Sequence, residues 1–227
     1  MSFPKPAENA QHFSRLERWA TFDCYGTLID WNGGIRRELA RVFGEERADE
    51  QLERYHQIEP TLQSGGERTY RDVMAGTMVE LGAPDEQDAL GRALPTWQPF
   101  PEVRTALEEA RARGWKLAIL SNTDRDFIEA SVEQIGVPFE LAIVASEIGS
   151  YKPGRAHWDR FFEQTGAATD QHVHVAQSHY HDVVPAHALG LTTVWINRYG
   201  ERAEPASTRE LQDLSTLPGT LDELVPA

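Results

Sequence analysis

Cysteine is almost absent from this chain: Cys24 is the single one among 227 residues. One thiol cannot form a disulfide within the chain, which favours a reducing compartment. Long apolar runs are lacking too, since none approaches the roughly 20 residues that a membrane-spanning helix needs. Residues 1–17 form a polar lead-in without the hydrophobic core of a signal peptide. We therefore expect a cytoplasmic location.

Basic residues are scarce relative to acidic ones, with 22 Lys and Arg against 36 Asp and Glu and a formal net charge of −14. Such a surface repels nucleic acids and anionic membranes, so neither is expected as a partner. A small anionic substrate is not excluded, because it experiences only the local field of its pocket. Internal repeats are missing as well, and the length suits one core with, at most, a smaller satellite.

Short apolar runs indicate buried parallel strands. They cover residues 18–24, 116–122, 173–178 and 192–197, with a weaker fifth run at 140–146. Helical patterns that end at a glycine separate the strands from residue 101 onwards. This alternation predicts an α/β fold with a doubly wound parallel sheet.

Residues 34–97 interrupt the alternation, because they show several helical patterns and no convincing strand. One apolar helical face is formed by Tyr70, Val73, Met74, Met78 and Leu81. We expect this segment to be a helical cap inserted after the first strand, with residues 18–33 and 98–227 forming the core domain. It would cover the carboxyl ends of the strands, where ligands bind in such sheets, and exclude water from them.

Each predicted strand delivers chemically useful side chains to that same edge. The first is followed by Asp23 and Thr27, the second by Ser121 and Asn122, the fifth run by Lys152, and the strand at 173–178 by the loop from Ser178 to Asp182. A carboxylate beside an ammonium group, hydroxyls and an amide is the set that nucleophilic carboxylate chemistry needs. Asp23 would attack, Lys152 would keep it ionised, and the hydroxyl and amide groups would hold an anionic substrate.

The motifs FDCYGTL, LSN, YKP and the SxxxD of SHYHD, in this order and spacing, resemble those of the haloacid dehalogenase superfamily. The resemblance covers roughly residues 18–200 and implies a Rossmann-like core with a cap between the first two motifs. Most members are magnesium-dependent phosphatases, which carry an acid two residues after the nucleophile and another in the last motif. Tyr25 and Gln177 stand at these positions here. Gln177 is a poor ligand for a hard cation.

The DxYGTL form of the first motif and the segment TTVWINR are similar to those of the L-2-haloacid dehalogenases. That resemblance implies hydrolysis of short 2-haloalkanoic acids to 2-hydroxy acids through an ester on Asp23, with a small carboxylate as substrate and without metal or cofactor. It also implies a homodimer. Two alternatives stay open: a magnesium-dependent phosphatase acting on a small phosphomonoester, and a family member that has lost its chemistry and only binds.

The resemblance also implies roles for individual residues. Thr27 and Lys152 would anchor the carboxylate of Asp23. Ser121 would bind the substrate carboxylate, and Asn122 would lie close to the halide. Ser178 and Asp182 would shape the pocket and place the hydrolytic water, although Asp182 could equally be a helix N-cap.

Several residues depart from the family pattern. His179 replaces an Asn, and its imidazole could either position the water or take its proton. Arg54 and His56 are candidates for the cap cation that cradles the halide. Trp158 replaces a Tyr as an aromatic wall of the pocket, and Tyr25 is either such a wall or a loop aromatic. His172 and His174, which share one face of a strand, are expected in the core or behind the site.

Overall fold

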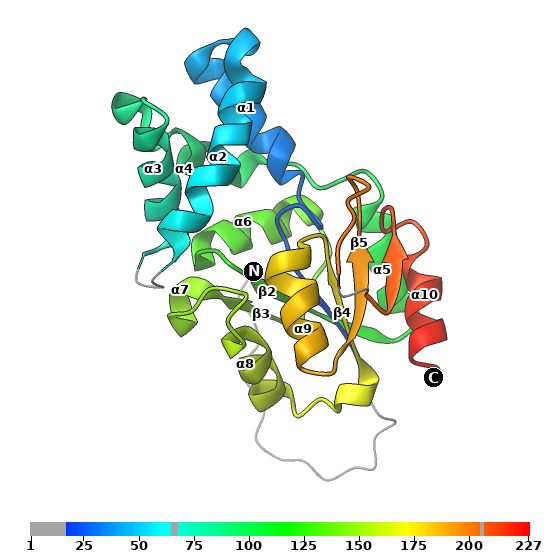
Figure 1. Cartoon of the computed structure of the whole chain (residues 1–227). Helices are drawn as coiled ribbons and strands as arrows, with labels where there is room; N and C mark the ends of the chain where they lie inside the picture. Colours follow the sequence, from blue (N-terminus) through cyan, green and yellow to red (C-terminus); the bar gives the residue numbers. More distant parts are fainter. Residues whose placement is uncertain (1–16, 65–67, 205–206) are drawn as a thin grey trace.

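The computed structural model describes residues 17–64, 68–204 and 207–227, and its centre is a six-stranded parallel sheet (Figure 1). The order of the strands is β3-β2-β1-β4-β5-β6, and every neighbouring pair is parallel. The strands are β1 Arg18–Phe22, β2 Trp115–Ser121, β3 Leu141–Val144, β4 His172–Ala176, β5 Thr192–Ile196 and β6 Arg209–Leu211. The predicted doubly wound α/β class is thus confirmed. Because β1 lies at the middle, its carboxyl end opens between β2 and β4.

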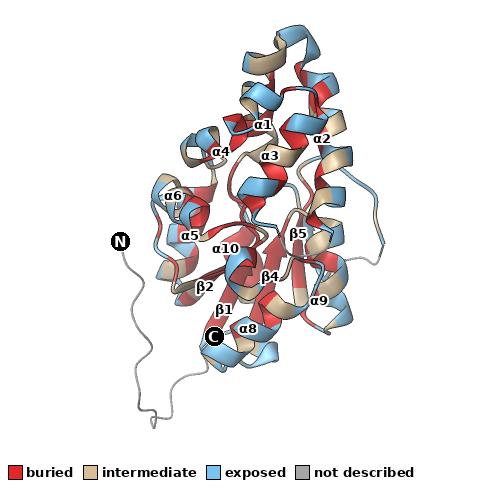
Figure 2. Ribbon diagram, turned by 90° about the vertical axis from the view of Figure 1, so that its left-hand side faces the viewer, coloured by how far each residue is buried: buried red, intermediate tan, exposed pale blue. Residues whose placement is uncertain are grey.

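Helices cover both faces of the sheet. One face packs on α5 Val103–Ala112, α6 Arg125–Ile135 and α10 Leu217–Leu224. The other packs on α8 Ala156–Thr165 and α9 Val184–Ala188, while the short α7 Ala145–Ile148 follows β3. Figure 2 shows the strands β1, β2, β4 and β5 as mostly buried and the outward faces of the helices as exposed.

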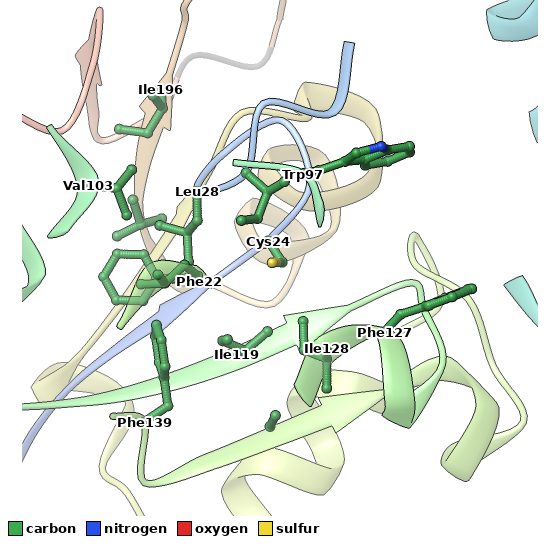
Figure 3. Packing of buried hydrophobic residues seen from close by; sticks show 14 of the residues in the cluster. Phe22, Cys24, Leu28, Trp97, Val103, Ile119, Phe127, Ile128, Phe139 and Ile196 are labelled. Carbon is green, nitrogen blue, oxygen red and sulfur yellow. The ribbon is translucent and has the colours of Figure 1, made fainter. Parts of the chain in front are cut away.

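Side chains of β1 point alternately to the two faces of the sheet and belong to two apolar layers. Trp19 points to the α8 side, where its ring meets Phe161 edge to face with centroids 5.4 Å apart. Phe22 points to the opposite side and packs on Phe139 and Leu28 (Figure 3). This burial on both faces explains why the strands read as continuous apolar runs in the sequence.

The segment between β1 and β2 is helical. It contains α1 Trp31–Phe43, η1 Glu45–Arg47, α2 Ala48–Gln63, α3 Tyr70–Glu80, η2 Pro84–Glu86, α4 Ala89–Ala93 and η3 Leu94–Thr96. These helices stand together at one end of the sheet (Figure 1). The five residues of the predicted apolar face are all buried. The first helix begins at Trp31, earlier than the expected boundary at residue 34, because Asp30 accepts a hydrogen bond from the N–H of Gly33 and caps the helix there.

A buried carboxylate ties this insert to the core. Asp124, between β2 and α6, accepts hydrogen bonds from the backbone N–H groups of Tyr70 and Arg71, each at 2.9 Å. These N–H groups open α3, where an anion is also favoured by the helix dipole. Asp124 therefore fixes the start of α3 over the carboxyl end of β2.

The sequence patterns missed two elements near the carboxyl terminus, β6 and α10. β6 has only three residues, with the sequence REL and no apolar alternation, and α10 contains Pro218 and Gly219. Several strands end earlier than expected. Among them, β1 ends at Phe22 and β4 at Ala176, because polar residues that follow leave the sheet to line a cavity. Residues 1–16 of the predicted lead-in lie outside the described residues. No helix in the described part of the chain is long and apolar enough to cross a bilayer.

Candidate active site

A cavity of about 450 Å³ lies between the carboxyl ends of the strands and the inserted helices. The core supplies the loops after β1, β2 and β4, and Lys152 from the segment before α8. The insert supplies residues of α1, α2 and α3. The expected position of the insert over the strand ends is thus what the structure shows.

Asp23 is the centre of the polar network in this cavity. Lys152 Nζ donates to Asp23 Oδ1 at 2.9 Å, and Thr27 Oγ1 donates to Asp23 Oδ2 at 2.8 Å. Thr27 Oγ1 in turn accepts from the backbone N–H of Gln177 at 2.8 Å. Both carboxylate oxygens are therefore oriented by groups from different parts of the chain.

Lys152 is shared between two carboxylates. Besides Asp23, its Nζ donates to Asp182 Oδ1 at 2.7 Å and to the carbonyl of Leu120 at 2.8 Å. Only 2% of Lys152 and none of Asp182 is exposed. Asp182 thus pairs with an ammonium group, and the helix-capping alternative is wrong, because the cap of the turn that contains it is Ser178.

Burial and charge shift the pKa values of these three groups in different directions. Burial raises the pKa of Asp23 above its usual value, and the nearby Lys152 offsets this only in part. Burial opposes the charge of Lys152, yet the carboxylates of Asp182 and Asp23 hold its pKa above the ordinary value. Burial also opposes ionisation of Asp182, but Lys152 and His174 lower its pKa to about 2. Lys152 and Asp182 therefore remain charged around Asp23, which ionises less readily than a free Asp.

A chain of buried polar side chains leads from Asp182 to residues of β4 and β1. His174 Nε2 lies 2.9 Å from Asp182 Oδ1, and His174 Nδ1 lies 2.8 Å from Thr21 Oγ1. The same hydroxyl lies 2.8 Å from His172 Nε2. Both histidines are buried on β4, which confirms the prediction that they lie in the core or behind the site.

The two residues at the end of β2 have different partners. Asn122 braces Lys152: its amide donates to the carbonyl of Lys152 at 3.0 Å and its Oδ1 accepts from the N–H of Lys152 at 2.6 Å. Ser121 lines the cavity, and its buried Oγ has no hydrogen-bond partner among the described residues. An unsatisfied buried hydroxyl beside a cavity is suited to bind a ligand.

The loop after β4 forms one π-helical turn, η5 His179–Val183. Ser178 Oγ caps this turn by accepting from the N–H of His181, and it lies 3.1 Å from His181 Nδ1. The ring of His179 packs edge to face on Trp195 at 5.1 Å. Both histidines line the cavity, and burial lowers the pKa of His181, so that its imidazole is neutral at pH 7.

Several aromatic side chains are part of the cavity wall. Tyr25 stacks on Tyr70 with ring centroids 6.3 Å apart and lies 3.0 Å from Ser131 Oγ through its hydroxyl. Trp31 Nε1 donates to the hydroxyl of Tyr70 at 2.9 Å, and the imidazole of His56 stacks on Trp31. Tyr25 is thus a wall of the pocket rather than a loop aromatic elsewhere.

Two predicted substrate-binding residues lie outside the cavity lining. Arg54 bonds to Gln51 and to the carbonyl of Glu80, because its position on α2 directs it towards the end of α3. Trp158 is fully buried on α8, at the face of the sheet that α8 and α9 cover. The centroid of its ring lies 5.2 Å from that of His174. Neither residue is therefore among those that line the cavity. Of the two cap candidates, only His56 reaches the cavity.

Sequence reasoning overlooked the polar face that α2 presents to the cavity. It is formed by His56, Glu59, Pro60 and Gln63. Their spacing of three and four residues places them on one side of a helix. This spacing can be read from the sequence, but polar residues at such a spacing ordinarily indicate a helix face that is exposed to solvent.

The oxygen atoms at this end of the sheet do not form a ligand set for the magnesium ion that a phosphatase of this kind would need. Both oxygens of Asp23 are engaged by Lys152 and Thr27, and Gln177 offers a neutral amide where such a site requires an acid. A methyl group at Gly26, whose φ is +90°, would come within 3.1 Å of the Gln177 amide oxygen, so this loop holds that side chain closely. No group of three His, Cys, Asp or Glu side chains in the described ranges is placed to hold a metal.

The fold and the cavity define a parallel α/β protein with a lysine-paired aspartate at the strand ends and a helical insert above it. The family model of the haloacid dehalogenase-like hydrolases matches residues 18–190, and the chain belongs to this family.

Named relatives include two bacterial enzymes. The chain is 31% identical to an (S)-2-haloacid dehalogenase of Pseudomonas sp. (strain YL) over 79% of its own length and 82% of that enzyme. It is 39% identical to haloacetate dehalogenase H-2 of Moraxella sp. (strain B), over 45% of this chain and 46% of that enzyme. A solved L-2-haloacid dehalogenase of Xanthobacter autotrophicus, with chloropropionic acid covalently bound, superposes with a TM-score of 0.78 at 20% identity, covering 91% of this chain and 98% of that one. At that identity the superposition shows the fold.

Proposed function

We propose that the protein is a hydrolytic dehalogenase that converts short 2-haloalkanoic acids into 2-hydroxy acids through an ester on Asp23, without a metal ion. The observation that carries the proposal is the carboxylate of Asp23, which is held by Lys152 and Thr27 at a cavity where Tyr25 and Gln177 replace the acids of a phosphatase. The likeness to (S)-2-haloacid dehalogenases supports it.

In the first step Asp23 attacks C2 of the substrate from the side opposite the halogen. The new C–O bond forms as the C–halogen bond breaks, and the halide leaves with the bonding pair and needs no proton. Thr27 and Lys152 fix the direction of attack, since each engages one oxygen of the carboxylate. Ser121, with its unpaired hydroxyl, binds the carboxylate of the substrate. Inversion at C2 follows.

In the second step water attacks the carboxyl carbon of Asp23. A neutral base takes one proton from this water and returns it to the oxygen of the departing 2-hydroxy acid, while the second proton leaves as Asp23 reionises. We assign the base to His181, because its imidazole is neutral and Ser178 orients its Nδ1, and the positioning of the water to His179. Lys152 stays protonated and stabilises the carboxylate that forms again.

The test measures halide release from both enantiomers of 2-chloropropionate, in parallel with phosphate release from p-nitrophenyl phosphate, each with Mg²⁺ and with EDTA. The proposal predicts halide release from the L enantiomer that EDTA does not reduce. Phosphate release that depends on Mg²⁺, without halide release, would show a phosphatase instead. Inactivity in both assays would favour a binding protein.

A further inference from the structure

Negative charge dominates the lining of the cavity. In the described part of the chain, carboxylates of Asp23, Glu59, Asp182 and Glu201 line it, and Lys152 is the only Lys or Arg that does so. The ammonium group of Lys152 already donates to Asp23, Asp182 and a carbonyl. No lysine or arginine of the described lining is therefore left to balance Glu59.

Glu59 is an unusual residue for such a position. It lies on α2 with 6% of its surface exposed, and its one hydrogen-bond partner among the described residues is the amide of Gln63. A buried carboxylate without a cation is costly unless a ligand supplies the charge. Pro60, the next residue, has no N–H, so the carbonyl of His56 lacks its helical donor. This wall thus offers acceptors and few donors.

Aromatic rings line the same cavity as this carboxylate. Trp31 and Tyr70 both line the cavity and are joined by a hydrogen bond of 2.9 Å, and Tyr25 stacks on Tyr70. Burial raises the pKa of Tyr70, and the nearby Tyr55 and Glu59 add to this effect. Aromatic rings near a carboxylate are the surroundings in which proteins bind quaternary ammonium groups.

We propose that Glu59, Trp31 and Tyr70 form a subsite for a cationic group, so that the preferred substrate is a 2-haloalkanoate with an ammonium group on the end away from the reacting carbon. The inference rests on the proposed function for the reacting end of the substrate. The cationic end of the substrate is inferred only from residues of the inserted helices. The subsite would also explain why the insert brings a carboxylate, rather than the expected Arg54, to the cavity.

A bound cation would also act on the ionisation of Glu59. Burial raises the pKa of this carboxyl to about 7, and its hydrogen bond to Gln63 offsets only part of the effect. A bound cation would lower that pKa and keep the carboxylate ionised.

The test uses a pair of ligands without a halogen, so that its result does not depend on catalysis. Calorimetry compares 4-(trimethylammonio)butanoate with 5,5-dimethylhexanoate, which has the same shape and no positive charge. Wild type should bind the cationic ligand at least about tenfold more tightly. Glu59→Gln should abolish this preference while still binding the neutral ligand. Glu53→Gln, an equal loss of charge at an exposed position of the same helix, should keep the preference.

Equal affinities in wild type, or a preference that survives Glu59→Gln, would overturn the subsite. Halide release then separates the two proposals. If the cationic ligand binds through Glu59 but neither 2-chloropropionate nor 2-chloro-4-(trimethylammonio)butanoate loses chloride, the subsite stands and the dehalogenase proposal fails. If both lose chloride with equal kcat/KM and Glu59→Gln changes neither, the dehalogenase proposal stands and the subsite fails.

Discussion

At the scale of single residues, the site is arranged around one buried ammonium group. Lys152 holds Asp23 and Asp182 together, and Asn122 fixes the backbone of Lys152 in both directions. A buried charge is tolerated only when it is paired and hydrogen-bonded, and Lys152 provides this pairing for both carboxylates, although Asp182 Oδ2 has no hydrogen-bond partner among the described residues. Asp23, Asn122, Lys152 and Asp182 thus form one hydrogen-bonded network, and Thr27 extends it through the second oxygen of Asp23.

Glu59 is the residue whose ionisation should affect stability most clearly. Its pKa is about 7 in the folded protein against an ordinary 4.5, so that in the range between them the unfolded chain is ionised while the folded protein keeps its proton. The free energy of unfolding should therefore fall as the pH rises. From pH 5 to pH 8 wild type should lose about 2.5 kcal/mol relative to Glu59→Gln.

Urea unfolding at the two pH values measures this difference. Burial raises the pKa values of Tyr55, Tyr70 and Tyr151, on which the charge of Glu59 also acts, so these hydroxyls stay neutral in this range. His56, on the same helix, has a lowered pKa because of burial. Glu53→Gln should follow the wild-type profile. Parallel profiles for wild type and Glu59→Gln would show that Glu59 ionises normally.

At the scale of elements, the motifs and strand patterns predicted the core better than the insert. Runs of apolar residues and their glycine stops located five strands, and the rule that parallel strands end at one edge brought Asp23, Ser121, Lys152 and Asp182 together. The insert was harder, because which face of α2 meets the cavity depends on how α1, α2 and α3 pack. Arg54 and Glu59 are five residues apart on one helix, and only packing decides between them.

The turn η5 provides a prediction about the second chemical step. His181→Asn should leave the first step intact and slow hydrolysis by about 100-fold, because a neutral base is lost. Intact-protein mass spectrometry after mixing with L-2-chloropropionate should then detect the ester. His179→Asn should keep turnover within about tenfold and show no ester. The reverse pattern would assign the proton transfer to His179.

At the scale of the whole molecule, the sheet carries polar residues at its carboxyl edge and the inserted helices lie over that edge. Asp124 joins them by bonding the first N–H groups of α3, at a point that no sequence motif indicated. The chain order of the motifs was sufficient for the fold class. It was insufficient for β6 and α10, which are short and carry weak patterns, and for Trp158, which packs in the apolar layer of α8 behind His174.

The central claim is that Asp23 forms a covalent bond with the substrate, and one turnover in water enriched in ¹⁸O tests it most directly. With enzyme in excess over L-2-chloropropionate, water attacks the carboxyl carbon of Asp23, so the label enters the enzyme. Mass spectrometry of the peptide that contains Asp23 should show one ¹⁸O atom, and the 2-hydroxy acid formed should carry none. Label in the product alone, with an unlabelled Asp23 peptide, would mean that water attacks C2 directly and would contradict the account.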